Sequence, residues 1–295
     1  MTTKFKYSLD RSSKKFPCPQ CGKKTFVQYI ETETGYYISD SLGRCDRETN
    51  CGFHSAPQKE VNPSFEYRAP VEVKTSFHPI ELLNNMFAES PQSDNLTTFL
   101  QGMFPLEKLF TVMQSYFLTG TSKPWINSTV FWQIDDQERI RAGKVMLYNR
   151  ETGKRVKEPF NKIGWVHQGN KEFNLSQCLF GLHRVNEAPE KPLGIVESEK
   201  TAIILSIFKP EYIWLATGAK GNFKLEFLKA IKKHRISAFP DKGEYVAWSE
   251  RAAELNNRGF KISVSNWLEQ TDQPIGTDLA DMYILSMQKD QKKQR

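Results

Sequence analysis

The chain has 295 residues, of which 39% are hydrophobic and 12% aromatic, and this composition excludes an intrinsically disordered protein. Its length suits two or three domains. No apolar run reaches the roughly 18–20 residues that span a bilayer, and the first residues, MTTKFKYSLDRSSKK, lack the apolar core of a signal peptide. We therefore expect a cytoplasmic protein without a membrane partner.

Positive charge is concentrated at the two ends of the chain. The net charge is +7, of which residues 1–30 contribute +6 and residues 289–295 contribute +3, while residues 31–288 carry −2. A basic end on a nearly neutral body favours a polyanionic partner such as nucleic acid. A solubilising tail is the alternative interpretation.

Four of the five cysteines lie close together near the N-terminus. They are Cys18, Cys21, Cys45 and Cys51. Without a secretory signal, such a cluster is more typical of a metal site than of disulfides. The first two form a C-x2-C pair followed by Gly22, which lets backbone amides approach the thiolates. The fifth cysteine, Cys178, lies in an apolar segment and is expected to be a buried thiol.

The segment between the two cysteine pairs, TFVQYIETETGYYIS, predicts a β-hairpin that turns near Gly35. Two ligand-bearing turns separated by a hairpin are the layout of a zinc ribbon around one tetrahedral zinc ion. We predict this domain over residues 1–60, with the four cysteines as ligands of a structural zinc. His54, which follows Cys51 with two residues between them, is the alternative fourth ligand.

A middle region is predicted over residues 61–190. It begins in a proline-containing linker, continues with helical spacing from Ile80 to Phe117, and changes to short β-rich runs separated by polar turns. The pattern predicts an α+β domain with an antiparallel sheet. Basic residues alternate there with Trp132, Tyr148 and Trp165, as in a platform for a single strand. A half-exposed sheet with a solvated face is the alternative.

Strand and helix patterns alternate over residues 191–295. The segments LGIVE, YIWLATG, RISAFPD and FKISVSNW predict strands, each followed by a helical pattern. Repeated β-α units imply a parallel sheet with helices on both faces. The whole chain is therefore predicted to be a mixed α/β protein of several domains, with a zinc ribbon, a middle α+β region and this C-terminal parallel module.

Acidic residues follow three of the four predicted parallel strands. Glu197 ends the first strand, Asp241 ends the third, and Asp278 with Asp281 lie beyond the fourth. Ligands of parallel sheets collect at the carboxyl ends of the strands. Several carboxylates at one edge suit a hard divalent cation such as Mg²⁺ or Mn²⁺. The alternative is a set of helix caps and first-turn acids, which is our interpretation of Glu199.

These acidic segments resemble a known family. GIVESEKTAIIL, ISAFPDKGEY and GTDLADMY are similar to the three acidic motifs of the Toprim domain, which occurs in bacterial primases, topoisomerases and some nucleases. Upstream, VFWQIDDQERIRAGKVMLYN, KEPF and CLFGLHRV occur in the order seen in bacterial-type primases. The chain resembles most closely the Toprim primase-like proteins of bacterial mobile elements, whose zinc module engages the template.

The resemblance implies roles for particular residues. Glu197 corresponds to the Toprim glutamate, a metal ligand or general acid/base, and Asp241 to the first acid of an Asp-x-Asp motif. Asp278 and Asp281 correspond to the third acidic motif. Gly243 occupies the second acidic position of the Asp-x-Asp motif, and Glu244 would substitute for the missing aspartate. Lys242 lies between Asp241 and Gly243. The implied nucleotide-binding or cofactor-binding residues are Asp281, Glu244, Lys144 and Lys157.

We predict from these features a DNA primase-like nucleotidyltransferase that acts on single-stranded DNA of a mobile element. Two alternatives stay open, a catalytically degenerate single-stranded DNA-binding protein and a Toprim nuclease. Gly243 favours the binding protein, and retention of the other acids favours an enzyme. The sequence has no GxxxxGK[ST] phosphate-binding loop. Expected partners are therefore single-stranded DNA, nucleotides and a separate helicase or mobilisation protein.

Overall fold

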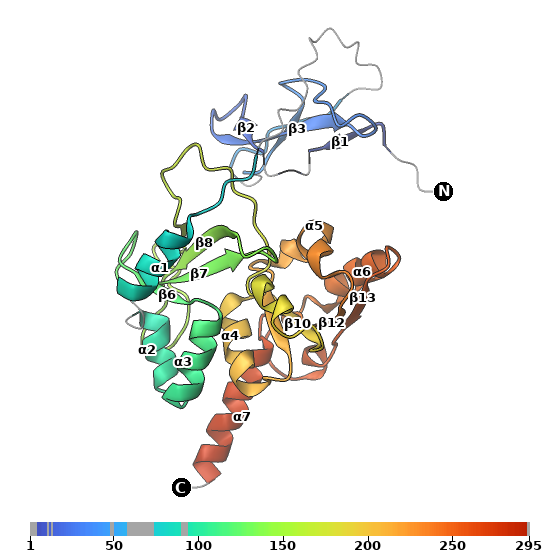
Figure 1. Ribbon diagram of the computed structural model, residues 1–295. Helices are drawn as coiled ribbons and strands as arrows, with labels where there is room; N and C mark the ends of the chain where they lie inside the picture. Colours follow the sequence, from blue (N-terminus) through green and yellow to red (C-terminus); the bar gives the residue numbers. More distant parts are fainter. Residues whose placement is uncertain are drawn as a thin grey trace. The chain divides into compact units, whose positions relative to one another are not determined.

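A computed structural model describes residues 5–10, 12, 14–47, 50–57, 74–89 and 94–293. The chain divides into two units, residues 1–75 and residues 76–295 (Figure 1). The predicted boundary at residue 60 and most of the predicted linker lie outside the described residues. The predicted boundary at residue 190 lies within the second unit.

Unit 1 is a small antiparallel sheet. Its strands are β1 (Tyr7–Leu9), β2 (Phe16–Pro17), β3 (Lys24–Glu31), β4 (Gly43–Cys45) and β5 (His54–Ser55). Strands β1, β3, β4 and β5 lie in that order, and β2 pairs with β3. The chain turns after β3 at Gly35, whose φ is +76°, and Tyr37 returns to pair with Ile30. The predicted hairpin is therefore present.

The core of unit 1 is very small. Its buried residues are Cys18, Phe26 and Cys45, with partly buried Phe16, Cys21, Cys51 and Phe53 packed against them. Gly43 faces this core, because a Cβ there would lie 2.2 Å from the Val27 carbonyl oxygen and 2.6 Å from the Phe26 ring. So few buried apolar groups cannot stabilise a sheet alone, and a second source of stability is needed.

Unit 2 begins with three helices, where the sequence predicted one helical region. They are α1 (Ile80–Glu89), α2 (Asn95–Gln101) and α3 (Leu106–Ser115). The Asp94 carboxylate accepts hydrogen bonds from the backbone amides of Leu96 and Thr97 and so caps α2. Pro105, which has no amide hydrogen to continue a helix, precedes α3.

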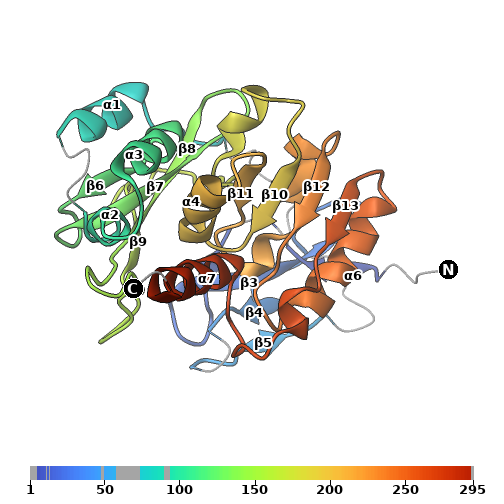
Figure 2. The same ribbon diagram turned by 90° about the horizontal axis from the view of Figure 1, so that it is seen from below.

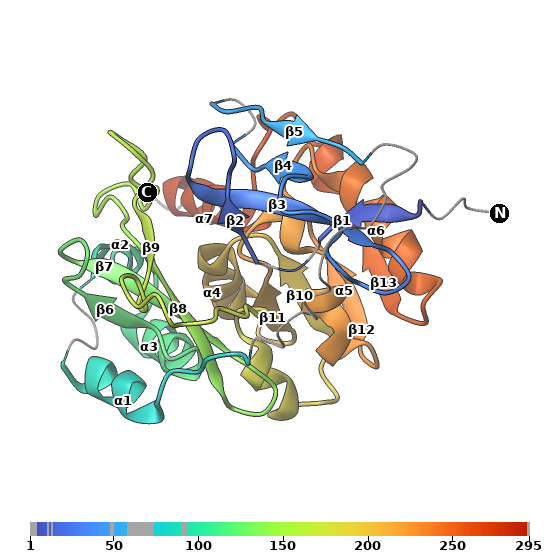
Figure 3. The same cartoon turned by 90° about the horizontal axis from the view of Figure 1, so that it is seen from above.

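A four-stranded antiparallel sheet follows these helices. Its strands, in spatial order, are β6 (Thr119–Thr121), β7 (Ser128–Ile134), β8 (Ile140–Met146) and β9 (Ile163–Trp165) (Figure 3). This confirms the predicted antiparallel sheet. Between β8 and β9 the chain forms a loop in which Tyr148 forms an antiparallel bridge with Arg155.

A four-stranded parallel sheet forms the rest of unit 2. In spatial order its strands are β11 (Ile213–Ala216), β10 (Leu193–Val196), β12 (Arg235–Ala238) and β13 (Lys261–Val264) (Figure 2). All neighbouring pairs are parallel. The chain passes from β10 to β11 on one side and returns to β12 on the other. The carboxyl ends of β10 and β12 therefore flank the point where the strand order reverses, which is where such sheets bind ligands.

Helices cover both faces of the parallel sheet. They are α4 (Glu199–Phe208), α5 (Leu225–Leu228), α6 (Tyr245–Asn256) and α7 (Leu279–Lys293). Alternate strand residues point to opposite faces. Ile195 therefore packs in a cluster with Leu228 and Trp248 of α5 and α6, whereas Val196 packs in a cluster with Ile203 of α4. The predicted fold class is confirmed, although α5 and the 3-10 turn Lys229–Ile231 replace one longer predicted helix.

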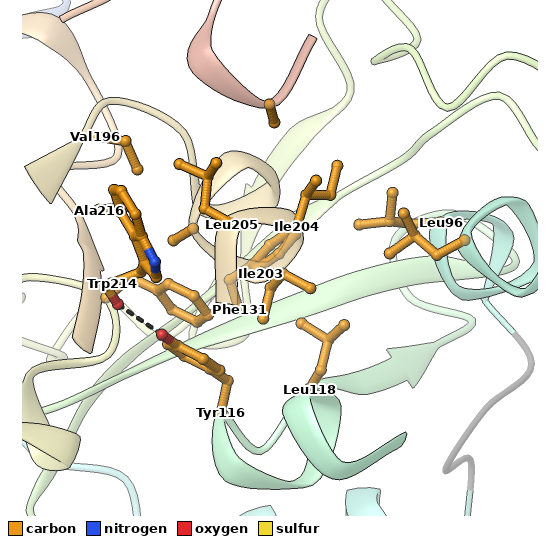
Figure 4. Close-up of a cluster of buried hydrophobic side chains, with 14 of the residues drawn as sticks. Leu96, Tyr116, Leu118, Phe131, Val196, Ile203, Ile204, Leu205, Trp214 and Ala216 are labelled. Carbon is orange, nitrogen blue, oxygen red and sulfur yellow. Dashed lines mark hydrogen bonds between the residues drawn. The ribbon is translucent and has the colours of Figure 1, made fainter. Parts of the chain in front are cut away.

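Helix α4 is buried between the two sheets of unit 2. Four consecutive residues, Ala202 to Leu205, are fully buried, as in a helix that is covered on all sides. Figure 4 shows three of them, Ile203, Ile204 and Leu205, in one cluster with Val196 and Trp214 of the parallel sheet and Phe131 of the antiparallel sheet. The Tyr116 hydroxyl, at the end of α3, donates a 2.7 Å hydrogen bond to the Trp214 carbonyl oxygen. One continuous core therefore joins the sequences on both sides of residue 190.

Among the described residues, every helix is too short or too polar to cross a bilayer.

Candidate functional site

The four clustered cysteines of unit 1 meet at one point. Their sulfur atoms all lie within 4.8 Å of one another, and the sulfurs of Cys18 and Cys51 are 3.7 Å apart. Tetrahedral zinc with Zn–S bonds of about 2.3 Å places sulfur atoms about 3.8 Å apart. Gly22 and Gly52, which follow Cys21 and Cys51, have φ of +69° and +64°, so that the chain turns around the site. The residues present therefore fit a zinc ion.

Hydrogen bonds favour the thiolate forms that bind zinc. The backbone amide of Lys23, with smaller contributions from neighbouring side chains, lowers the pKa of Cys21 to about 6, and the Thr25 hydroxyl, 3.2 Å from the Cys45 sulfur, lowers the pKa of that thiol. Against a backbone hydrogen bond that lowers it, burial and the neighbouring thiols raise the pKa of Cys51 to about 11, so a bound cation is needed to favour all four thiolates. His54 points elsewhere, because its Nε2 lies 3.0 Å from the Tyr29 hydroxyl and its ring stacks on the tyrosine. The geometry favours Cys51 over His54 as the fourth ligand.

The second candidate site is the group of acids that follow the parallel strands, here called the acidic cluster. It comprises Glu197, Asp241, Glu244, Asp278 and Asp281. Glu197 directly follows β10, Asp241 follows β12, and Asp278 and Asp281 begin α7. Glu244 precedes α6, where its backbone amide donates to the Asp241 carbonyl oxygen at 3.0 Å. Strand β10 thus contributes one acid and its neighbour β12 leads to two others.

The charges of the acidic cluster act on one another. Burial raises the pKa of Asp241 to about 8, and the negative charges of Asp278, Glu197, Asp281 and Glu244 contribute to the rise. Burial also raises the pKa of Glu197, with Glu244 as a further cause. Asp241 therefore lies close enough to the other four carboxylates to be repelled by each of them, and a divalent cation would relieve that repulsion. Among the described residues, no three of these acids bring their oxygen atoms within 4.8 Å of one another as the four cysteine sulfurs do.

Asp278 and Asp281 also have an ordinary structural role. The Asp281 amide donates to Asp278 Oδ1 at 2.9 Å, and the Asp278 amide donates to Asp281 Oδ2 at 3.2 Å. This reciprocal pair is a capping box at the start of α7. The Thr201 hydroxyl donates to Asp278 Oδ2 at 2.6 Å. A carboxylate has about four acceptor positions, so capping and metal binding are compatible.

The backbone explains why a glycine occupies the second Asp-x-Asp position. Gly243 has a φ of +97°, a conformation that an aspartate adopts only with strain. Its amide donates to Glu269 Oε1 at 2.7 Å. The ammonium of Lys242 donates to the carbonyl oxygens of Glu269 and Thr271, so this lysine does not pair with the acidic cluster.

The two lysines implied by the resemblance occupy different environments. Lys144, on β8, is 7% exposed, and its ammonium lies 2.9 Å from Glu199 Oε1 and 2.7 Å from the Gly218 carbonyl oxygen. Glu199 does lie in the first turn of α4, but it is 1% exposed and forms a buried ion pair that the sequence did not predict. Lys157 is exposed in the loop between β8 and β9.

Two aromatic residues of the predicted single-strand platform are core residues. Trp132 and Tyr148 are 0% and 1% exposed, so bases cannot stack on them. Arg139 and Arg141 both pair with the carboxylate of Asp135. These observations correct the interpretation of the strands themselves as a stacking surface.

The structure adds four cations around the acidic cluster that sequence patterns did not assign to it. They are Lys154, Arg155, Lys200 and Lys220. Against the effects of burial and of Asp278, Lys200 and Lys154 lower the pKa of Asp281. Arg155 and Lys220 similarly oppose the rise in the pKa of Glu197. Lys200 lies in the first turn of α4 and the other three lie between the longer elements, so the proximity of these four cations to the acidic cluster follows only from folding.

The raised pKa of Asp241 predicts how stability depends on pH without added divalent ions. An unfolded aspartate ionises near 3.8, whereas the folded chain holds the proton until about pH 8. The free energy of unfolding of unit 2 should therefore fall as pH rises from about 4 to 8, by at most about 1.4 kcal/mol per pH unit from this group. Asp241→Asn should flatten the fall in urea unfolding curves. The exposed Asp272→Asn is the control, and identical slopes for Asp241→Asn and the unmodified chain would contradict the assignment.

Comparisons with known proteins match two families. Residues 94–242 match the family described as a domain of unknown function (DUF6371), and residues 5–65 match a zinc beta-ribbon finger. Unit 1 is accordingly a zinc ribbon with a four-cysteine cluster. A comparison with curated proteins finds no match.

Several solved structures are similar at low identity. The primase fragment of the bacteriophage T7 primase-helicase is 15% identical, with a TM-score of 0.45 over 95% of this chain and 98% of that one. The Escherichia coli primase catalytic core is 14% identical (TM-score 0.44; 70% and 75% covered). The Aquifex aeolicus primase with its zinc-binding and RNA polymerase domains is 12% identical (0.43; 97% and 79%). At these values the function has to be inferred from the residues of the site.

Proposed function

The chain belongs to the family described as a domain of unknown function (DUF6371), and for this member we propose a DNA primase-like nucleotidyltransferase activity on single-stranded DNA. The observation that carries the proposal is the electrostatic coupling of Asp241 to Glu197, Asp278, Asp281 and Glu244 at the switch point of a parallel sheet. Their sequence segments resemble Toprim motifs, and a zinc ribbon precedes them, as in primases.

The acidic cluster would hold Mg²⁺ or Mn²⁺ through Glu197, Asp241, Asp278 and Asp281, with Glu244 as a further ligand in place of the second acid of the Asp-x-Asp motif. Bound there, a divalent ion supplies charge neutralisation and alignment for in-line attack at a phosphorus atom. In primer extension the 3′-hydroxyl oxygen bonds to the α-phosphorus, the bond to the bridging oxygen breaks, and pyrophosphate leaves. The hydroxyl loses its proton. Glu197, whose pKa is raised by burial and by Glu244, is our candidate for the group that accepts it.

The cations around the acidic cluster are the proposed phosphate contacts. Lys154, Arg155 and Lys157 lie exposed in the loop between β8 and β9, and the first two act on the acidic cluster electrostatically. Lys144 is proposed to position this region and not to bind nucleotide, because its ammonium is already held by Glu199 and Gly218. We further propose that the zinc ribbon contacts template and that a separate helicase or mobilisation protein of a mobile element is the partner.

Primer synthesis tests the proposal directly. The full chain with zinc bound should extend or synthesise primers on single-stranded DNA with nucleotides and Mg²⁺ or Mn²⁺. Glu197→Gln should lower the rate at least about a hundredfold, because the substituted side chain can neither bind a cation strongly nor accept a proton. Labelled products on a denaturing gel give the measurement. The exposed Glu226→Gln is the matched control and should retain full activity.

Three outcomes would contradict the proposal. Template cleavage that depends on the same acids would favour a nuclease. Salt-sensitive binding without any reaction would favour the degenerate DNA-binding protein. Primer synthesis that is equal in Glu197→Gln and the unmodified chain would exclude the acidic cluster as the active site.

A further inference from the structure

The start of the loop that follows β11 is hydrogen-bonded to the backbone at the end of β10, next to Glu197 of the acidic cluster. The Thr217 amide donates to the Val196 carbonyl oxygen at 3.0 Å, and the Gly218 amide donates to the Glu197 carbonyl oxygen at 2.8 Å. The Gly218 carbonyl oxygen in turn accepts from Lys144 Nζ at 2.7 Å. Because two of these bonds go to the end of β10, the start of the loop is held beside Glu197.

Lys220, two residues further along this loop, directs its ammonium at the acidic cluster. Its Nζ lies 3.0 Å from Glu244 Oε1. Its charge also opposes the rise in the pKa of Glu197 that burial and Glu244 cause. Lys220 therefore faces carboxylates that follow two neighbouring strands, β10 and β12. The Lys220 side chain is 67% exposed, so it is free to move away.

Three other lysines near the acidic cluster have different partners. Lys144 is paired with Glu199, Lys242 donates to backbone carbonyls, and Lys200 Nζ lies 3.3 Å from the Gly153 carbonyl oxygen. Within the described part of the chain, Lys220–Glu244 is the salt bridge that involves a carboxylate of the acidic cluster.

We infer that Lys220 is an internal counter-cation of the acidic cluster that a divalent ion must displace from Glu244. The inference rests on the proposed function, in which the acidic cluster holds that ion. A lysine ammonium and a divalent cation repel each other and compete for the same carboxylate oxygen. Lys220 therefore weakens the affinity for the divalent ion and raises the ion concentration at which the acidic cluster fills. No bond is made or broken in this exchange.

Direct Mn²⁺ binding tests the inference without depending on activity. Free Mn²⁺ is measured by electron paramagnetic resonance in titrations of the full chain with zinc bound. Lys220→Gln should bind Mn²⁺ about fivefold more tightly at low ionic strength, which is the upper range for an exposed ion pair. The gain should shrink at high salt because the interaction is screened. Lys220 is exposed, so its substitution is not expected to disturb folding.

Two comparisons make the test specific. Lys233→Gln removes the same charge from an exposed position and should leave the affinity unchanged. In a Glu244→Gln background the Lys220→Gln effect should largely disappear, because the contested carboxylate is gone. Unchanged or weaker Mn²⁺ binding by Lys220→Gln would overturn the inference while leaving the metal site intact. Absence of Mn²⁺ binding by the unmodified chain would overturn both the inference and the proposed function.

Discussion

Replacing Cys45 by serine should release the zinc and unfold unit 1. The buried core of this unit consists of Phe26 and two of the cysteines, Cys18 and Cys45. Structural zinc contributes apparent folding free energies of about 10–16 kcal/mol in small zinc domains, far more than such a core supplies. Hydrogen exchange should lose protection in β3 and β4, while the protection of unit 2, which contributes no cysteine to the cluster, should persist.

Zinc content measured by mass spectrometry completes this test. The unmodified chain and Cys178→Ala should contain one zinc ion per chain, because Cys178 belongs to the core of unit 2. His54→Ala should also keep zinc, since the His54 ring is bound to Tyr29. Loss of zinc from His54→Ala would make the histidine a ligand. Retention of zinc and native protection in Cys45→Ser would refute the four-cysteine site.

Replacing Glu199 by glutamine should destabilise unit 2 by about 3–5 kcal/mol. The substitution keeps the shape of the side chain but leaves the Lys144 ammonium buried without its counter-charge. The Gly218 carbonyl oxygen and the glutamine amide oxygen could still accept hydrogen bonds from Lys144, but neither carries a negative charge. Urea unfolding followed by tryptophan fluorescence gives the free energy of unfolding.

A double substitution separates the charge effect from loss of packing. Lys144→Met combined with Glu199→Gln should recover most of the lost stability, because no buried charge remains unpaired. The exposed ion pair Arg251–Glu254 is the control, and Glu254→Gln should cost less than about 1 kcal/mol. A free energy of unfolding for Glu199→Gln within 1 kcal/mol of the unmodified chain would show that the buried ion pair does not matter for stability.

Much of the fold could be predicted because its signals are local. The cysteine spacing predicted the zinc ribbon, and alternating β and α patterns predicted all four parallel strands, β10 to β13. The predictions failed where a short element depends on its neighbours. Segment 222–233 has a helical pattern but forms a single turn of α-helix and a 3-10 turn, with Phe227, Leu228 and Ile231 buried.

The candidate sites were predictable to different degrees. Glu197 and Asp241 could be placed at one edge because parallel strands align their carboxyl ends. Gly243 was noted as a departure from the motif, but its cause is a backbone φ of +97° that no sequence pattern reports. Trp132 was interpreted as a surface residue because strand alternation does not reveal which face another layer covers.

The sequence by itself determined the features that depend on residues close together along the chain. These are the cysteine pairs, the strand periodicity and the acids that follow strands. Contacts between distant segments were settled by folding. Lys144 and Glu199 are 55 positions apart, and they meet because α4 packs between two sheets. Lys220 faces Glu244 because β11 and β12 both flank β10 and run parallel to it, so that the segments after them lie at the same edge of the sheet. Such pairs depend on the packing of whole layers, which spacing along one strand or helix does not encode.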